Sequence, residues 1–290
     1  MNQTWTEPEA EAYTRWLATH HYENFHIVSF LLPRDLHQDF YNVYSFCRWA
    51  DDLGDEIGDT QESLRLLAWW QDLLDRMYEG TAEHPVFVAL RATAERHRLP
   101  KQPFSDLIKA FVADQTVTRY PSWDDVFYYC RHSANPVGRL VLYLCGYSDA
   151  ERQRLSDATC TALQLANFWQ DVSIDLRKDR VYIPLEVITR HGYSVDDLFA
   201  GRETPQFQVV MKEVVDRARE LFHQGLPLCR MVDKRLSLDL ELFSRGGLRV
   251  LDKIERQNYR VLHSRPAIGK VERITLLLGT LVRVVFARAA

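Results

Sequence analysis

The sequence predicts an all-α protein, and three observations support this prediction. Apolar residues recur at helical spacing through most of the 290 residues, and no stretch alternates apolar and polar residues for long enough to indicate a sheet. Only 12 glycines occur. With 46% hydrophobic residues the chain can bury a large core, and we expect a single helical domain over 1–290.

Capping and helix-breaking residues place the expected helices. Thr6 caps the first helix, with Glu9 three positions on, and Ser122 with Asp125 makes a capping box before a long segment that Pro136 should kink. The helix that begins near Arg34 should fray at Gly54 or Gly58. The expected helices cover 6–19, 34–56, 60–78, 85–98, 103–118, 122–143, 161–175, 206–231 and 235–262.

Composition excludes several classes of protein. A formal net charge of −4 gives no basic face for nucleic acid. The five cysteines are scattered and never spaced as Cys-x-x-Cys, which predicts reduced thiols in a cytoplasmic protein without a zinc site. The N-terminus lacks the pattern of a signal peptide. The apolar tail 271–290 is shorter than the roughly 20 residues that cross a bilayer, so we interpret it as a packing helix with scope for peripheral membrane contact.

The segment from Thr161 to Asp175 predicts a metal site. As a helix it places Asn167, Asp171 and Asp175 four residues apart on one face, with Gln164 one turn earlier, in apolar surroundings. Carboxylates at this spacing repel each other by a few tenths of a kcal/mol, so a cation should lie between them. Rows of oxygen ligands suit Mg²⁺, which usually links carboxylates to a substrate's phosphates.

A second pair of carboxylates lies upstream. Asp51 and Asp55 are also four residues apart, and Arg48 falls one turn before Asp51. If the two helices face each other across a central cavity, four aspartates converge on one diphosphate site. A basic loop follows the later pair; it contains Arg177, Lys178 and Arg180. Basic residues there could equally cap the helix C-terminus.

Most of the chain resembles the squalene/phytoene synthase family. The matching segments are Asp51-Asp52-Leu53-Gly54-Asp55, Asp171-Val172-Ser173-Ile174-Asp175, Gln164-Leu165-Ala166-Asn167 and Asp179-Arg180-Val181-Tyr182-Ile183-Pro184. The resemblance implies an all-α isoprenoid-synthase fold whose central cavity is flanked by two aspartate-rich helices, a requirement for Mg²⁺, and a prenyl diphosphate substrate. Gly54 departs from the expected pattern, since a better helix former would suit that turn.

Within the family, the chain is most similar to the hydroxysqualene synthases of bacterial hopanoid pathways. This resemblance rests on His21-Tyr22-Glu23-Asn24-Phe25 with Leu31-Leu32-Pro33, and on Ser133 to Leu140. It implies that presqualene diphosphate and water give hydroxysqualene and diphosphate, in functional coupling with other enzymes of the squalene pathway. It also implies active-site roles for Tyr129 and Tyr259 and a substrate contact for His21.

The expected roles follow from the chemistry. Mg²⁺ acts as a Lewis acid on the departing diphosphate, and arginine and lysine add charge-assisted hydrogen bonds to its oxygens. The expected metal ligands are Asp51, Asp55, Asn167, Asp171 and Asp175. The expected substrate contacts are His21, Arg48, Gln164, Asn167, Arg177 and Arg180, with Lys178 as a further cation. Arg48 is also expected to take part in catalysis, beside Tyr129 and Tyr259.

Several alternatives remain open at this level. Squalene, presqualene diphosphate, dehydrosqualene and phytoene synthases share the aspartates and would condense two prenyl diphosphates such as farnesyl diphosphate. A squalene synthase would need NADPH, and the lack of Gly-x-Gly-x-x-Gly does not decide this, because the family does not depend on that motif. A di-iron bundle would use Glu23 with His26 and Glu220 with His223, but it leaves the aspartates without a role. A helical scaffold would release no diphosphate.

Overall fold

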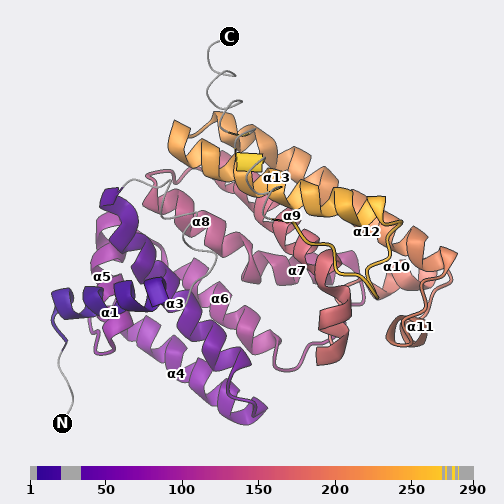
Figure 1. Ribbon diagram of the computed structural model, residues 1–290. Helices are drawn as coiled ribbons and strands as arrows, with labels where there is room; N and C mark the ends of the chain where they lie inside the picture. Colours follow the sequence, from indigo (N-terminus) through magenta and orange to yellow (C-terminus); the bar gives the residue numbers. More distant parts are fainter. Residues whose placement is uncertain (1–4, 21–33, 270–271, 273–275, 278–279, 281–290) are drawn as a thin grey trace. The chain divides into compact units, whose positions relative to one another are not determined.

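The computed structural model describes residues 5–20, 34–269, 272, 276–277 and 280. Within these ranges the chain is helical, and its one β feature is an isolated parallel bridge between Arg119 and Val181. The all-α prediction is therefore confirmed. The chain forms two compact units, whose α-helices are labelled along the sequence in Figure 1. Unit 1 comprises Met1–Thr116 and Pro136–Gln153, and unit 2 comprises Val117–Asn135 and Arg154–Ala290.

Unit 1 is built around one central helix. Helix α3 (His37–Asp55) contacts α1 (Glu7–His20), α4 (Thr60–Tyr78), α5 (Pro85–His97) and α6 (Lys101–Ala113), and the short helix η1 (Arg34–Leu36) precedes it. Helix α8 (Asn135–Leu144) starts at the unit boundary. The ring of Phe46 on α3 lies 4.9 Å from Phe104 and 5.7 Å from Trp70. All three side chains are fully buried, so this aromatic core fixes α3 against α4 and α6.

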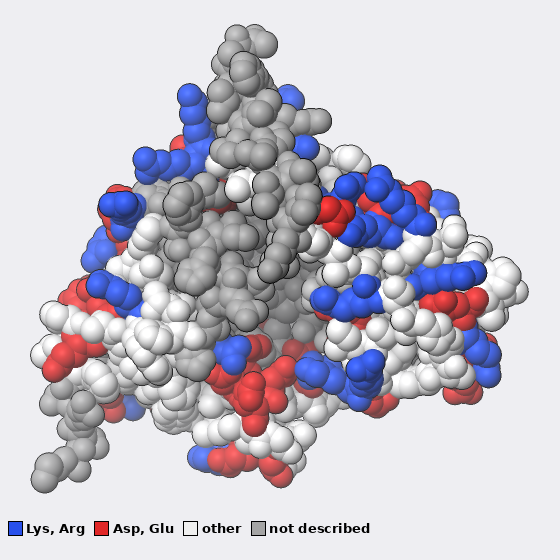
Figure 2. Space-filling model, viewed as in Figure 1, with Lys and Arg blue, Asp and Glu red and all other residues white. Residues whose placement is uncertain are grey.

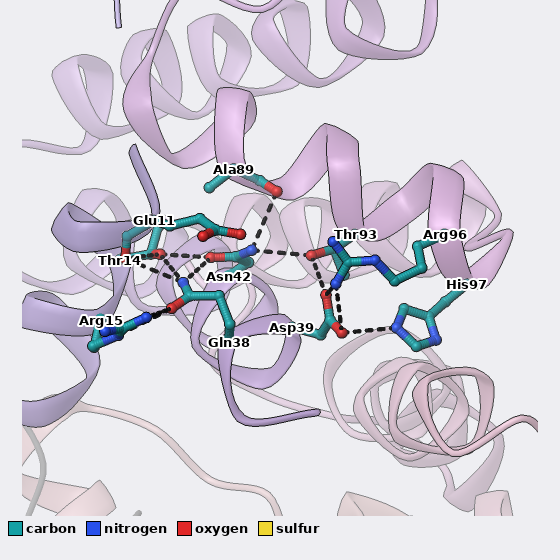
Figure 3. A network of polar contacts seen from close by, with 10 residues as sticks. All are labelled: Glu11, Thr14, Arg15, Gln38, Asp39, Asn42, Ala89, Thr93, Arg96 and His97. Carbon is teal, nitrogen blue, oxygen red and sulfur yellow. Dashed lines mark hydrogen bonds and ion pairs between the residues drawn. The ribbon is translucent and has the colours of Figure 1, made fainter. Parts of the chain in front are cut away.

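A buried polar network sets the rotation of α3 about its axis (Figure 3). Asp39 is 1% exposed. Its carboxylate accepts hydrogen bonds from Thr93 Oγ1 at 2.8 Å and Arg96 Nη1 at 3.0 Å, and His97 Nε2 lies 2.8 Å from it. One turn later, Asn42 Nδ2 donates to Thr93 Oγ1 at 3.0 Å. Because buried carboxylates are costly unless fully paired, α3 is held in one orientation, and the turn carrying Asp51 and Asp55 is held with it.

Unit 2 contains the second aspartate helix. Helix α9 (Ala150–Asp175) begins in unit 1 and runs into unit 2, and the remaining helices of unit 2 pack with it or on one another. A Cβ added to Gly225 would lie 2.1 Å from Thr159 Oγ1 of α9, so these backbones approach closely. The remaining elements are α7 (Trp123–Ser133), η2 (Leu176–Lys178), α10 (Leu185–Arg190), α11 (Val195–Phe199), α12 (Pro205–Gly225), η3 (Leu226–Arg230) and α13 (Lys234–Arg256).

Most expected helices are present, with shifted ends. The 60–78 helix has the predicted bounds, and Thr6 and Glu9 cap α1 as expected, with Thr6 N donating to Glu9 Oε2 at 3.0 Å. The 122–143 segment is more than kinked: it forms two helices, α7 and α8, separated at Ala134. The helix expected over 206–231 ends at Gly225, and Pro227 follows in η3, consistent with the missing N–H of proline.

One further expected helix needs correction at its end, and other expectations lie outside the described residues. The helix expected over 235–262 ends at Arg256, because Asn258 and Tyr259 adopt left-handed backbone conformations. The short helices α10 and α11 were not expected. His21 falls outside the described residues, as does most of the 271–290 tail. Among the described helices none is both long and apolar enough to cross a membrane. The single domain over 1–290 stays a prediction, and the chain passes between the two units three times.

Candidate active site

The last turns of α3 and its C-cap Glu56 bring three carboxylates to one arginine. Arg48 Nη1 bonds Asp51 Oδ2 at 3.2 Å, Nη2 also pairs with Asp52, and Glu56 Oε1 lies 3.9 Å away. Burial raises the pKa of Asp51, Arg48 lowers it, and repulsion from Asp55, Asp52 and Glu56 adds to the rise. The Asp52 carboxylate therefore forms its own ion pair with Arg48. This turn concentrates more negative charge than one arginine neutralises.

Gly54 does not disturb this turn. Helix α3 continues through Asp55, and Gln115 Nε2 of the segment after α6 donates to the Gly54 carbonyl at 2.9 Å. A Cβ at Gly54 would lie 3.5 Å from the Phe111 side chain, an ordinary van der Waals contact. The position therefore supports the approach of α3 and α6 without requiring glycine.

The end of α9 carries the second pair. Burial, with repulsion from Asp171 as the next cause, raises the pKa of Asp175 to about 6, while Arg180 and Lys178 lower it. Arg265 pairs with Asp171: Nε bonds Oδ1, and Nη2 lies 3.3 Å from Oδ2. The expected repulsion between carboxylates four apart is thus present. The positive charge next to Asp171 is therefore the guanidinium of Arg265, a residue that the sequence analysis did not single out.

The other predicted residues of α9 and its loop lie where helical spacing puts them. Asn167 is exposed and Gln164 half-buried, one and two turns before Asp171. Arg177 and Lys178 are exposed in η2. The backbone N–H of Arg180 donates to the Asp175 carbonyl at 2.9 Å, so the chain folds back onto the end of α9. The basic loop therefore adjoins the carboxylates, as its sequence position indicated.

An aromatic cluster lies beside Asp175. The ring of Tyr129 on α7 is 5.5 Å from Tyr120, 5.8 Å from Tyr182 and 6.0 Å from Phe168, and Phe168 and Tyr182 stack at 3.7 Å. Phe168 and Tyr182 also line a cavity of about 10 Å³ together with Asp175 and Arg180. Tyr129 therefore belongs to the aromatic surroundings of the second aspartate pair, and its catalytic role stays a prediction.

Tyr259 has different surroundings. It follows α13 in a left-handed conformation, is half-buried, and has a pKa raised by burial and by Glu255. Lys212 and Asp216 of α12 are its other charged neighbours. In the described part of the chain, no hydrogen bond or ring contact joins Tyr259 to Tyr129 or to Asp175. Its role in catalysis stays a prediction that this geometry does not strengthen.

The residues present fit a hard divalent cation. Each aspartate pair offers oxygen ligands on one helix face, and burial, followed by repulsion from nearby carboxylates, raises the pKa of Asp51 and of Asp175. No group of three or more His, Cys, Asp or Glu side chains with metal-binding spacing occurs in the ranges that the structure describes. Asp51 and Asp171 lie in different units, so their convergence on one site stays a prediction.

The distribution of surface charge bears on nucleic-acid binding, which would need a basic face. On the face shown in Figure 2, Lys and Arg lie in small groups beside Asp and Glu, and no extended basic area is visible.

The di-iron alternative would use Glu220 on α12. Arg217 Nη1 donates to the Glu220 carboxylate at 3.1 Å, and Glu220 lines an open outer groove of about 540 Å³. Glu23 and His26 are outside the described residues.

Comparison with known proteins identifies the family. The family model described as squalene/phytoene synthase matches residues 18–272. The chain is 34% identical over 270 residues to the hydroxysqualene synthase of Rhodopseudomonas palustris, covering 91% of this chain and 89% of the relative. It is 31% identical over 272 residues to the phytoene synthase of Thermus thermophilus, covering 93% of this chain and 92% of the relative.

A solved structure agrees with these matches. The crystal structure of squalene synthase HpnC from Alicyclobacillus acidocaldarius is 44% identical and superposes with a TM-score of 0.84, covering 87% of this chain and 95% of the other. The all-α fold, the two aspartate pairs and the match over residues 18–272 all point to the same family. The chain is therefore a member of the squalene/phytoene synthase family.

Proposed function

We propose that the protein is a hydroxysqualene synthase, which converts presqualene diphosphate and water into hydroxysqualene and diphosphate in a Mg²⁺-dependent reaction of hopanoid biosynthesis. Members of the family use prenyl diphosphates, and this chain is such an enzyme. One observation carries the proposal: Asp175 lines a small cavity together with Arg180 of its own loop and the stacked rings of Phe168 and Tyr182. A substrate with a charged diphosphate attached to an apolar chain needs basic residues for the diphosphate next to an apolar, aromatic surface for the chain.

The charged side of this arrangement would bind and ionise the diphosphate. Asp171, Asp175 and Asn167 of α9, with Asp51 and Asp55 of α3, would hold Mg²⁺. When bound, Mg²⁺ stabilises the negative charge that develops on the departing diphosphate. Charge-assisted hydrogen bonds to the phosphate oxygens would come from Arg48, Arg177, Lys178 and Arg180, joined by Arg265, which already bonds Asp171.

The aromatic side would protect the carbocation that remains. Departure of diphosphate from presqualene diphosphate leaves a cyclopropylcarbinyl cation on an apolar chain. Ring faces of Tyr129, Phe168 and Tyr182 can stabilise a nearby cation, and their burial keeps bulk water away from it. The proposal requires that one water molecule reach the rearranged cation. The apolar substrate and product are the reason to include peripheral membrane contact and coupling to other squalene-pathway enzymes in the proposal.

The runner-up is condensation of two prenyl diphosphates, as in phytoene, dehydrosqualene, presqualene diphosphate or squalene synthases. The relative from Thermus thermophilus and the 44%-identical solved structure carry names of this kind. This reaction would use the same aspartates, and a squalene synthase would add NADPH as the reductant. The two reactions differ in substrate and in the source of the product's oxygen.

One assay separates these reactions. Purified protein with Mg²⁺ is given presqualene diphosphate or farnesyl diphosphate, with and without NADPH, in ¹⁸O-labelled water. We expect presqualene diphosphate to give labelled hydroxysqualene without NADPH. Squalene formed only with NADPH, or a hydrocarbon formed only from two prenyl diphosphates, would assign the runner-up instead. No diphosphate release from any prenyl substrate would reject both.

A further inference from the structure

Arg119 joins three segments of unit 2 that meet next to the basic loop. Its Nη1 donates to the carbonyl of Thr118 at 2.8 Å and also to the carbonyl of Asp179, and its Nη2 pairs with the Asp179 carboxylate. The guanidinium carbon lies 5.1 Å from the ring centroid of Phe199 on α11. The planar guanidinium thus bonds Asp179 twice while lying over an aromatic ring, an arrangement for which lysine is no substitute.

The backbone around Arg119 runs beside the segment that follows α9. Val181 N donates to the Thr118 carbonyl at 2.9 Å, and Leu185 N donates to the Tyr120 carbonyl at 2.9 Å. Together with the bridge between Arg119 and Val181, these bonds hold the two stretches parallel over a few residues. The side chain of Arg119 extends this pairing by two positions, from Val181 to Asp179.

Asp179 is the residue at which the chain reverses after α9. Its φ of +55° is left-handed, a conformation that costs a non-glycine residue roughly 1 kcal/mol or more. Immediately after this turn, Arg180 N donates to the Asp175 carbonyl at 2.9 Å, and Arg180 lines the small cavity with Asp175. The position of Arg180 beside Asp175 therefore depends on the left-handed turn at Asp179, which Arg119 holds.

We propose that Arg119 is a positioning residue for the diphosphate end of the site: by clamping the left-handed turn at Asp179, it keeps Lys178 and Arg180 beside Asp175. This inference rests on the proposed function, because it assigns these cations to the diphosphate. Arg119 itself touches no substrate. We therefore expect substitution of Arg119 to change the affinity of the protein for diphosphate in the presence of Mg²⁺.

A purely structural role makes a different prediction. Exposed ion pairs contribute little to stability, and the Arg119 side chain is 27% and the Asp179 side chain 72% exposed. If the pair did no more than this, removing it would lower the melting temperature slightly and leave diphosphate binding unchanged. Arg202, which pairs with Asp197 on the surface of the same unit, provides the matched control.

The test measures binding of inorganic pyrophosphate with Mg²⁺ by calorimetry, so it does not depend on knowing the prenyl chain. We expect Arg119→Ala to bind roughly tenfold more weakly than the unaltered protein, the size expected for losing one well-directed charge-assisted hydrogen bond. Arg202→Ala should bind normally. Asp179→Asn, which keeps an acceptor oxygen and tolerates a left-handed φ, should stay close to normal.

A second set of variants shows whether the effect passes through Asp179. Asp179→Gly keeps the left-handed turn but removes the carboxylate, and Arg119→Ala combined with Asp179→Gly should bind no more weakly than Arg119→Ala alone. If Arg119→Ala does not fold, Arg119→Lys replaces it, and weakened binding is expected there too. In turnover of a prenyl diphosphate, Arg119→Ala should raise KM as well as lower kcat.

The outcomes separate this inference from the proposed function. Equal pyrophosphate binding by the folded Arg119 variants and the unaltered protein would overturn the positioning role. Weakened pyrophosphate binding without turnover of any prenyl diphosphate by the unaltered protein would overturn the proposed function and leave the positioning role standing. Absence of pyrophosphate binding in the unaltered protein would overturn both.

Discussion

Asp239 on α13 is a buried carboxylate at odds with its surroundings. It is 3% exposed, and neither carboxylate oxygen has a hydrogen-bond partner among the described residues. Burial, with repulsion from Asp233 as the second cause, raises its pKa from 3.8 to about 7. The folded state thus holds this proton more tightly than the unfolded state. The contribution of Asp239 to the free energy of unfolding should be most favourable below about pH 4, fall as the pH rises to about 7, and level off above that.

Asp239→Asn should remove this pH dependence. The variant should be more stable than the unaltered protein above pH 7, by an amount on the order of a few kcal/mol, because no charge has to be buried. Urea unfolding at pH values from 4 to 8 measures the difference. Asp216→Asn, at an exposed carboxylate paired with Lys212, is the control and should keep the original curve. Parallel curves for Asp239→Asn would mean that Asp239 is already neutralised.

Asp175 predicts a pH effect on metal binding. Its pKa of about 6 in the metal-free protein means that protons compete with Mg²⁺ for this carboxylate as the pH falls through 6. We expect the Mg²⁺ concentration for half-maximal diphosphate release to rise by up to about tenfold per pH unit below that point. Mg²⁺ titrations of turnover at pH 5, 6, 7 and 8 measure it. A requirement that is the same at pH 5 and pH 7 would remove Asp175 from the metal ligands.

At the scale of elements, two neighbouring glycines on α13 have opposite surroundings. A Cβ at Gly247 would lie 2.2 Å from Cζ of Phe222, whose side chain is fully buried on α12. A Cβ at Gly246 would meet nothing within 4 Å. Gly247 is therefore what lets α13 approach α12 this closely, whereas Gly246 serves no such contact.

Paired substitutions should therefore change stability in opposite directions. Gly247→Ala should destabilise the protein by about 1–3 kcal/mol, because the Phe222 ring must move within a packed core. Gly246→Ala should stabilise it by up to about 1 kcal/mol, since alanine is the better helix former. Thermal or urea unfolding of both variants measures this. Similar values for the two would show that α12 and α13 adjust without cost.

The ends of the elements show where local sequence information stops. The bounds of α4 and the caps of α1 and α7 follow from neighbouring residues, and these were predictable. The close approach of α12 to α9 at Gly225 depends on Thr159, 66 positions earlier in the chain numbering, and no local pattern predicts it. The break at Ala134 was expected only as a kink at Pro136. Helices α10 and α11 are too short for their periodicity to be recognised.

At the scale of the whole molecule, the proposed reaction needs both aspartate pairs. Asp51 belongs to unit 1 and Asp171 to unit 2, so their cooperation can be tested by combining substitutions. Asp51→Asn and Asp171→Asn should each lower turnover by at least about a hundredfold, because each removes a ligand from the proposed catalytic metal site. The double variant should lose little more than the worse single variant, as expected for residues that act as a unit.

The measurement is the initial rate of diphosphate release, with helical circular dichroism as the check on folding. Asp72→Asn at an exposed position of unit 1, and Asp216→Asn at a half-buried position of unit 2 whose carboxylate pairs with Lys212, should keep full activity. Losses that multiply in the double variant would indicate independent roles for the two pairs. An active Asp171→Asn enzyme would reject the metal site on α9 altogether.

The sequence by itself determined the helical class, the family resemblance, and the two rows of carboxylates, because residues four apart on a helix share a face wherever the helix lies. Only the tertiary structure decided that Arg265 pairs with Asp171 across 94 positions, that Arg119 holds Asp179 across 60, and that Tyr129 packs against Phe168 and Tyr182. The physical reason is range: helical periodicity is set within a few residues, whereas these contacts depend on how distant helices and loops pack together.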